Sequence, residues 1–400
     1  EMLDCLKLLH YHLGSQIPNI RDIRAGATEA ARFYVGLVQE GAPMGLLDIG
    51  GGLAIDYDGT SSNSSNSRNY TMQEYCVDVV EEVMTICNET RSPHPTIISE
   101  SGRALVAYYS VLLMNILDTN VFRPEDEQVV TPQLRPVLDN LLYVKRTLGK
   151  ENIQECLNDL NYYREEIRNK FLYGQVNMRQ RAAAEHLYWS IMSDLSNFAH
   201  QLEFVPPDLK NIDHQLSDIY YANFSVFQSL PDVWAINQVF PIMPIHRLDE
   251  APTRRAILSD ITCDCEGKID RFIGREEVGN TLPLHAPPAD DDYILGVFLV
   301  GAYQETLGDL HNLLGDTNVV SVTYGEDGNF MLHHELDGDT VADVLSYVEF
   351  EPKKLEAMIR TKAEIAVREG KITAQQRRRI ISAYSAGLRG YTYYETDQED

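Results

Sequence analysis

Gly45-Leu-Leu-Asp-Ile-Gly-Gly-Gly52 is a short apolar run that ends in three glycines. The apolar residues over 45–49 predict a buried strand, and the glycines predict a tight turn directly after it. Such a turn can bring backbone N–H groups close to an anion, because no side chain stands in the way. Glycine triplets also occur in turns that bind nothing, so this motif needs support from other parts of the chain.

The sequence around this motif alternates between short apolar runs and amphipathic segments, in the manner of β/α units. We predict strands over 6–13 and 96–99 and helices over 28–40 and 72–89. The segment 58–69 is rich in Ser and Asn, and we expect an exposed, mobile loop there. Only about three units are present, whereas a closed (β/α)8 barrel needs roughly 200 residues or more. We therefore expect the C-terminal strands and helices of such a barrel.

The rest of the chain divides into further segments, which give an α/β plus β fold class. Residues 1–120 hold the barrel units. Residues 121–215 carry long, charged sequence with apolar positions three and four apart, which predicts a helical insert, either a hairpin or a small bundle. Residues 216–336 are rich in Val, Ile, Phe, Thr and Tyr, which predicts a largely antiparallel, sandwich- or barrel-like sheet. Residues 337–400 predict a helical C-terminal region that ends in an acidic tail over 395–400.

The composition limits the kinds of partner. The chain has 400 residues, 44% hydrophobic and 24% charged, which is typical of a soluble globular protein of two or three domains. Acidic residues outnumber Lys and Arg by 60 to 34, so we expect no nucleic acid or membrane partner and an attraction for small cations. We find no membrane-spanning run and no targeting segment. Six cysteines without zinc-type spacing favour a reducing compartment, the cytoplasm or a chloroplast.

Side chains near the predicted strand ends suit a phosphorylated aromatic ligand. The imidazole of His12 could lie flat against a ring while the hydroxyl of Ser15 reaches a phosphate. Glu100 and Arg103 stand three apart after a predicted strand, where a carboxylate could keep a pyridine nitrogen protonated and a guanidinium could hold phosphate through two hydrogen bonds. Tyr303 follows another apolar strand and could donate to the same phosphate. Each of these residues, taken alone, also has an ordinary structural explanation.

A further pair of reactive side chains lies in Ser259-Asp-Ile-Thr-Cys-Asp-Cys-Glu-Gly-Lys-Ile-Asp270. The thiol of Cys263 could return a proton to a carbanion, and the carboxylate of Asp264 could bind the distal cation of a basic amino acid. The alternative is a structural cysteine beside a turn aspartate, and Cys265 leaves open which thiol matters. Combined with the ring and phosphate groups above, the set suits pyridoxal phosphate.

In this order, the motifs resemble those of the alanine-racemase-type pyridoxal phosphate decarboxylases, and within that family the plant-like biosynthetic arginine decarboxylases. The resemblance covers nearly the whole chain, including the helical insert and the helical C-terminus. It rests on His12-Leu-Gly-Ser-Gln16, Gly50-Gly-Gly52, Glu100-Ser-Gly-Arg103, Asn223-Phe-Ser-Val-Phe-Gln-Ser-Leu-Pro-Asp232, Ser259-Asp-Ile-Thr-Cys-Asp264 and Gly301-Ala-Tyr-Gln-Glu-Thr-Leu-Gly-Asp-Leu-His-Asn-Leu-Leu-Gly-Asp316.

The resemblance implies decarboxylation of L-arginine to agmatine and CO2 for putrescine and polyamine synthesis, with pyridoxal phosphate as cofactor. It implies that His12 stacks on the cofactor ring and that Glu100 pairs with the pyridine nitrogen. Cys263 would be the proton donor and Asp264 a substrate ligand, acting in a homodimer or higher homo-oligomer on cofactor bound mainly by the other subunit. The implied phosphate ligands are Ser15, Gly50, Gly51, Gly52, Arg103 and Tyr303. A requirement for Mg2+ stays open.

The sequence departs from the family pattern in two places. Cys265 and Glu266 stand where the family usually has Ser and Asp. The Schiff-base lysine of the family lies on the first barrel strand, whereas this sequence matches from about the sixth, and neither Lys7 nor Lys268 corresponds to it. We therefore expect a C-terminal portion of a longer precursor, with the N-terminal portion as a candidate partner. Two alternatives stay open: a decarboxylase of ornithine, lysine or diaminopimelate, and a non-catalytic fragment or partner.

Overall fold

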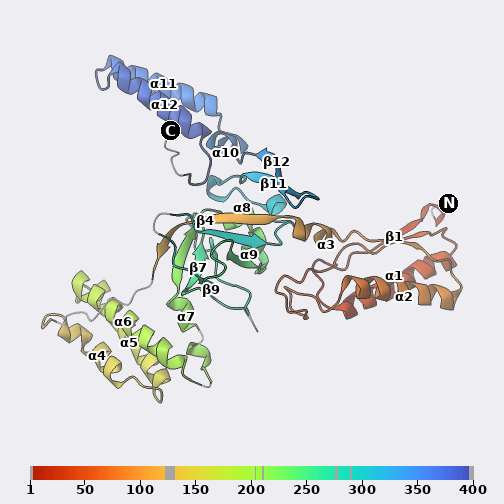
Figure 1. The fold of residues 1–400 in the computed structure, drawn as a ribbon, viewed down its shortest axis with the longest axis horizontal. Helices are drawn as coiled ribbons and strands as arrows, with labels where there is room; N and C mark the ends of the chain where they lie inside the picture. Colours follow the sequence, from red (N-terminus) through yellow and green to blue (C-terminus); the bar gives the residue numbers. More distant parts are fainter. Residues whose placement is uncertain are drawn as a thin grey trace.

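The computed structural model describes residues 3–121, 131–202, 204–209, 211–274, 278–288 and 291–395. An N-terminal β/α part, a helical bundle and a group of C-terminal helices extend from a central sheet (Figure 1). The predicted acidic tail lies outside the described residues, apart from Glu395. None of the helices in the described ranges is long and apolar enough to cross a membrane.

The N-terminal part is a parallel sheet covered by two helices. Its strands pair in the order β1-β2-β3, and all are parallel. Helices α1 and α2 lie between successive strands in the chain and pack on the same face of the sheet. The elements are β1 (Leu8–His10), α1 (Ile20–Gln39), β2 (Leu46–Asp48), α2 (Met72–Thr90) and β3 (Thr96–Ile98). The β/α units predicted from the sequence are therefore present, with shorter strands than expected.

Both helices begin at side-chain caps. In α2, Thr71 and Glu74 exchange hydrogen bonds in a capping box, so the helix begins at Met72 as predicted. Helix α1 begins at Ile20, well before the predicted start at 28, because the Asn19 side chain accepts a hydrogen bond from the Arg21 N–H. The polar residues of its first turns hid this start from a reading based on apolar periodicity.

Among the described residues, helices cover only one face of the parallel sheet. Leu47 is fully buried under the helices, and its neighbours on adjacent strands, Leu9 and Ile97, pack into the same cluster. On the opposite face Leu8 is 42% exposed and Ile98 is 37% exposed. Because parallel sheets are normally covered on both faces, this face presents apolar surface that more chain could cover.

The central sheet is mixed, with strands in the order β6-β10-β4-β5-β7-β8 and β9 beside β7. Only the β5–β7 pair is parallel, so the predicted, largely antiparallel arrangement is present. Its strands are β4 (Val111–Asn120), β5 (Asp218–Ala222), β6 (Ile242–Pro244), β7 (Arg254–Ser259), β8 (Lys268–Ile269), β9 (Leu282–Leu284) and β10 (Ile294–Phe298).

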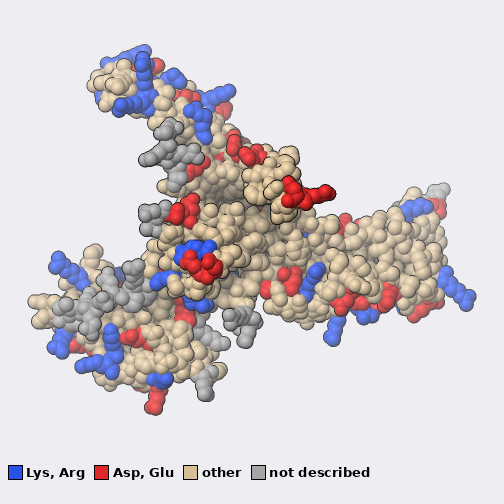
Figure 2. All heavy atoms as spheres, viewed as in Figure 1, with Lys and Arg blue, Asp and Glu red and all other residues tan. Residues whose placement is uncertain are grey.

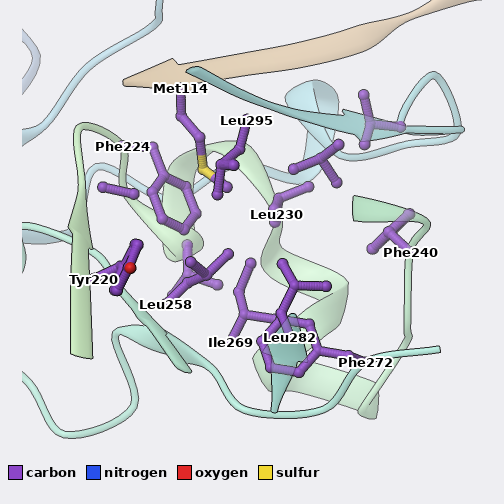
Figure 3. Close-up of a cluster of buried hydrophobic side chains, with 14 of the residues drawn as sticks. Met114, Tyr220, Phe224, Leu230, Phe240, Leu258, Ile269, Phe272, Leu282 and Leu295 are labelled. Atoms are coloured by element: carbon purple, nitrogen blue, oxygen red, sulfur yellow. The ribbon is translucent and has the colours of Figure 1, made fainter. Parts of the chain in front are cut away.

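Strand β4 corrects the predicted division of the chain. The sequence analysis grouped 1–120 with the barrel units, but 111–120 pair with β5 and β10 in the central sheet. The reason is that helix α3 (Gly102–Val106) and a following 3-10 turn carry the chain away from β3 and straight into the second sheet (Figure 1). The buried side chains of this sheet and of the segments beside it, among them Met114, Phe224 and Leu295, form a continuous core (Figure 3).

The remaining elements are mostly helical, as predicted. The insert is a bundle with its own core, made of α4 (Arg135–Thr147), α5 (Ile153–Leu172), α6 (Met178–Ala199) and α7 (Ile212–Gln215). After the sheet come a hairpin and the C-terminal helices: β11 (Val319–Tyr324), β12 (Phe330–Leu336), α10 (Val341–Tyr347), α11 (Pro352–Arg368) and α12 (Ala374–Arg389). Lys and Arg gather over α11 and α12 (Figure 2), so the net charge of −26 is unevenly distributed.

The Ser/Asn-rich segment 58–69 is more structured than predicted. Gly59, Thr60 and Ser61 are exposed as predicted, whereas Asn66 and Ser67 are buried. Ser67 Oγ donates to Asp56 Oδ1 at 2.6 Å, and Asn66 Oδ1 accepts from the Val239 N–H at 3.2 Å. The short polar side chains therefore act as internal hydrogen-bond partners that attach this loop to the central sheet domain.

Gly301 marks a close approach between the segment after β10 and the C-terminal end of α3. A Cβ added at Gly301 would lie 1.9 Å from the Val106 carbonyl oxygen, whereas one added at Gly36 in α1 would meet nothing within 4 Å. We predict that Gly301→Ala destabilises the protein by about 1–3 kcal/mol or more through this overlap. We predict that Gly36→Ala stabilises it by roughly 0.5–1 kcal/mol. Urea denaturation of both variants checks this, and equal midpoints would contradict it.

Candidate active site

The carboxyl ends of the parallel strands meet at the glycine triplet. The Ile49 N–H donates to the Ile98 carbonyl, and the Glu100 N–H donates to the Gly50 carbonyl, both at 2.9 Å. The residue after β3 is thus tied to the turn after β2. Glu100 and the glycines share one edge of the sheet, where the sequence predicted them to meet.

His12 is held against the same turn. The Gly51 N–H donates to His12 Nδ1 at 3.1 Å, which leaves Nε2 as the protonated nitrogen of the neutral ring. Gly50 has a φ of +63°, and a Cβ there would lie 2.4 Å from the Tyr11 carbonyl oxygen. Glycine is therefore required at this position, both by its backbone conformation and by the lack of space.

Two further side chains at this edge, His10 and Asp48, were not predicted. Asp48 Oδ2 lies 2.8 Å from His10 Nδ1, and Asp48 Oδ1 accepts from the Gly50 N–H at 2.9 Å. Burial raises the pKa of Asp48, but these hydrogen bonds outweigh it and hold that pKa below its ordinary value. Asp48 is the last residue of β2 and lies two positions before Gly50, and this position is the sequence signal that could have identified it.

His10, Asp48 and Glu100 form a small polar cluster. One potential ligand atom from each lies within 4.8 Å of the others. Such a set could bind a divalent cation, but exposed acidic groups commonly gather without one. Nothing in this arrangement favours the Mg2+ that the sequence analysis left open. The Glu100 side chain is exposed, so a ligand at the strand ends could reach it.

Arg103 joins the N-terminal part to the central sheet domain. Its side chain lies on α3 and is 9% exposed. One terminal nitrogen donates to the Tyr57 hydroxyl at 2.9 Å and to the Ala302 carbonyl at 3.4 Å, and the other donates to Ser15 Oγ at 3.3 Å. The guanidinium carbon lies 5.4 Å from the centre of the Tyr303 ring. Ser15, Arg103 and Tyr303, predicted separately, are thus brought together.

The charge of Arg103 is not neutralised by a neighbour. Among the described residues its guanidinium has no carboxylate within 4.0 Å, and its buried Nε has no hydrogen-bond partner. Tyr303 places its hydroxyl where a Cβ on Gly102 would lie, 2.7 Å away. A buried, unpaired guanidinium beside two hydroxyls is costly unless an anion binds it. This arrangement fits a phosphate group.

Cys263 and Asp264 lie in an exposed turn after β7. Asp264 contacts His311, and Asn312 accepts the Cys263 N–H at 3.1 Å through Oδ1. These contacts connect the turn with residues 311–312. They do not connect it with Ser15, Arg103 and Tyr303, which form the Arg103 cluster. The predicted site residues therefore fall into two groups within one chain, one around Arg103 and the glycine triplet and one around Cys263.

The turn that carries Cys263 is organised by a buried carboxylate, Asp260. Its Oδ2 accepts from the Val226 N–H at 2.8 Å, and its Oδ1 accepts from the Thr262 N–H at 2.9 Å and the Thr262 hydroxyl at 2.7 Å. A Cβ on Gly267 would lie 2.2 Å from Asp260 Oδ1. Both residues belong to segments quoted in the sequence analysis, but no spacing rule distinguishes such a turn-forming Asp from a catalytic one.

Family models match three successive parts of the chain. Residues 3–107 match the pyridoxal binding domain of pyridoxal-dependent decarboxylases. Residues 131–213 match the arginine decarboxylase helical bundle domain, and residues 341–394 match the arginine decarboxylase C-terminal helical extension. The latter two account for the helical insert and the C-terminal helices.

Curated relatives and a solved structure are similar to this chain over nearly its whole length. The biosynthetic arginine decarboxylase of Bacteroides thetaiotaomicron is 46% identical over 395 residues, which cover 98% of this chain and 62% of the relative. That of Nostoc sp. is 44% identical over 393 residues, covering 98% and 58%. The structure of the biosynthetic arginine decarboxylase from Campylobacter jejuni has a TM-score of 0.81 at 29% identity, covering 99% of this chain and 63% of that one. The chain belongs to the biosynthetic arginine decarboxylase family.

Membership in the arginine decarboxylase family confirms the resemblance drawn from the motifs. The chain spans less than two thirds of the length of these relatives. The relatives named above are bacterial, and the plant-like assignment stays a prediction. The assignment of individual residues to cofactor, substrate and proton transfer also stays a prediction.

The contact between Arg103 and Tyr57 can be tested by removing one hydroxyl. Tyr57 is buried, and burial raises the pKa of Tyr57 although Arg103 opposes the rise. We predict that Tyr57→Phe lowers stability by about 1.5–3 kcal/mol, since it removes a hydrogen bond to a charged group. Tyr34→Phe is the matched control, because the buried Tyr34 hydroxyl has no partner in the described structure. Urea midpoints should fall for Tyr57→Phe only, and a larger fall for Tyr34→Phe would refute the assignment.

Proposed function

We propose that this chain provides most of the active site of an enzyme that converts L-arginine to agmatine and CO2 with pyridoxal phosphate. The observation that carries the proposal is the buried, unpaired guanidinium of Arg103 beside Ser15 and Tyr303. A matched pyridoxal binding domain over residues 3–107 supports the choice of phosphate ligand. The product would feed putrescine and polyamine synthesis.

The parallel strands would be the last strands of a (β/α)8 barrel. The uncovered face that carries Leu8 and Ile98 supports this, because barrel strands bury that face against the strands opposite. We propose that a portion outside residues 1–400 supplies the other strands and the cofactor lysine. Lys7, which lies beside β1, has no role in this scheme.

The cofactor would lie at the carboxyl ends of β1, β2 and β3. Its phosphate would be held by Arg103, Ser15, Tyr303 and the Gly52 N–H. The Gly50 and Gly51 N–H groups donate to Asp48 and His12, so these two glycines would let the phosphate approach the backbone closely without donating to it. His12, fixed by the Gly51 N–H, would stack on the ring, and Glu100 would face the pyridine nitrogen. When bound, pyridoxal phosphate supplies an electron sink for the bond broken at the substrate α-carbon.

Cys263 and Asp264 would complete the site of a second copy in a homodimer or a higher homo-oligomer. Their contacts within one chain lie away from the Arg103 cluster, which supports this arrangement. The Asp264 carboxylate would accept hydrogen bonds from the substrate guanidinium, and Cys263 would donate a proton to the α-carbon. The net charge of −26 would draw a cationic substrate toward the protein.

Asp264 alone does not select among basic amino acids, since a carboxylate also binds an ammonium group. Ornithine, lysine and diaminopimelate are therefore the competing substrates, and family membership favours arginine. The cytoplasm or a chloroplast remains the proposed location. A purely non-catalytic partner is disfavoured, because such a chain would have no need of an unpaired guanidinium at the strand ends.

The substrate assignment predicts a specific activity. Residues 1–400 produced together with the N-terminal portion of the encoded polypeptide should release agmatine from L-arginine in the presence of pyridoxal phosphate. Residues 1–400 alone should release none, because the cofactor lysine is missing. Mass spectrometry of products from arginine, ornithine, lysine and diaminopimelate measures this. A higher kcat/KM for any of the other three, or turnover by residues 1–400 alone, would contradict the proposal.

A further inference from the structure

The turn with Cys263 and Asp264 is contacted by two consecutive side chains from another loop. His311 Nε2 meets Asp264 Oδ2. Asn312 contacts Cys263 twice: its Oδ1 accepts the backbone N–H at 3.1 Å, and its Nδ2 lies 3.5 Å from Sγ. Each of the two functional groups of the turn therefore has one partner of its own.

The short helix α8 (Val226–Ser229) contacts both the Cys263 turn and the loop that carries His311 and Asn312. On one side, its Val226 N–H donates to Asp260, the buried carboxylate of the Cys263 turn. On the other side, the Phe227 carbonyl accepts the Asp309 N–H at 3.0 Å, and the Phe227 ring lies 4.3 Å from the His311 ring, centre to centre. A Cβ on Gly308 would lie 2.5 Å from the Gln228 carbonyl oxygen, so the second loop lies directly against the helix.

The backbone of the second loop also fits this placement. Asn312 has a φ of +55°, in the left-handed region that Asn adopts more readily than most residues. This conformation turns its amide toward Cys263, where one end accepts and the other donates. Such a two-point contact requires both the acceptor and the donor of an amide.

We propose that His311 and Asn312 are positioning residues, with His311 orienting the Asp264 carboxylate for the substrate cation and Asn312 orienting the Cys263 thiol. The proposal rests on the proposed function for the roles of Asp264 and Cys263. His311 holds one carboxylate oxygen and leaves the other for the substrate. Because Asp264 and His311 are both partly exposed, a carboxylate without this contact would sample several rotamers, and substrate binding would have to restrict them.

Two substitutions separate the hydrogen bond of His311 from its packing. His311→Phe keeps a ring against Phe227 but removes the donor, whereas His311→Gln can place an amide nitrogen near the Nε2 position. In the complete enzyme we expect His311→Phe to raise KM for arginine about tenfold or more, the scale for losing a hydrogen bond to a charged group. Its kcat should stay within about threefold, and the KM of His311→Gln should stay within about threefold of the wild type.

Other outcomes would contradict the role of His311. Equal increases in KM for the Phe and Gln variants would mean that the ring, not its donor, matters, and would overturn the assignment. Unchanged KM in both would also overturn it. A decrease in kcat without a change in KM would mean that His311 acts in a step other than substrate binding, which would also overturn the assignment.

The contact of Asn312 with Cys263 can be measured without any turnover. In residues 1–400 carrying Cys265→Ser, iodoacetamide alkylation of Cys263 can be followed by mass spectrometry on the tryptic peptide 256–268, which then holds a single thiol. Asn312→Asp keeps the shape and the acceptor but removes the N–H that faces Sγ and adds a negative charge. We expect it to slow alkylation roughly threefold to tenfold, because the anionic thiolate loses a donor and gains a repulsive neighbour.

Asn158→Asp is the matched control. Asn158 lies on the exposed surface of α5 in the helical bundle, and the substitution changes the net charge by the same amount. Alkylation of Cys263 should be unaffected by it. An unchanged rate in Asn312→Asp, or equal slowing by both variants, would overturn the role of Asn312. If instead the wild-type complete enzyme fails to decarboxylate arginine while Asn312→Asp still slows alkylation, the proposed function fails and the positioning of Cys263 stands.

Discussion

The buried guanidinium of Arg103 is the interaction on which the site depends. The Arg103 side chain donates hydrogen bonds to Ser15 in the loop after β1, to Tyr57 in the loop after β2 and to the Ala302 carbonyl after β10. Three of its partners are thus 46 to 199 residues away along the chain. A buried cation is costly unless its hydrogen-bonding groups have partners, and the buried Nε of Arg103 has none in the described structure.

The central sheet domain supports this arrangement from its own side. The Ala302 carbonyl that accepts from Arg103 also accepts from Gln304, whose side chain is paired with the buried Asp232 of helix α9 (Pro231–Ile236). The same region holds the Cys263 turn through α8. One domain therefore contributes the Ala302 carbonyl to the contacts of Arg103 and carries the Cys263 turn elsewhere on its surface. The proposed homo-oligomer, in which this turn would complete the site of a second copy, accounts for that separation.

Local motifs could be predicted because the residues that define them are consecutive or only a few positions apart. Gly50 and Gly52 adopt a positive φ close to other backbone atoms, which requires glycine there. Glu100 and Arg103 follow β3 at a spacing that brings both to the strand ends. The start of α2 at Met72 was predicted from its amphipathic pattern, and the structure adds the capping box that fixes it. What the sequence did not reveal depends on distant partners: Asp48 acquires its role from His10, and the 58–69 loop becomes ordered through Val239. The assignment of β4 failed for the same reason, since its pairing partners lie far along the chain.

The central claim is that Arg103 recognises a phosphate group at the strand ends. The most direct test compares pyridoxamine phosphate with pyridoxamine, which carry the same ring and no reactive aldehyde, by titration calorimetry against residues 1–400 and the Arg103→Gln variant. The account predicts tighter binding of the phosphorylated ligand to the wild type and loss of most of that preference in the variant, with unchanged circular dichroism in both. An equal preference for the phosphorylated ligand in a folded Arg103→Gln variant would contradict it.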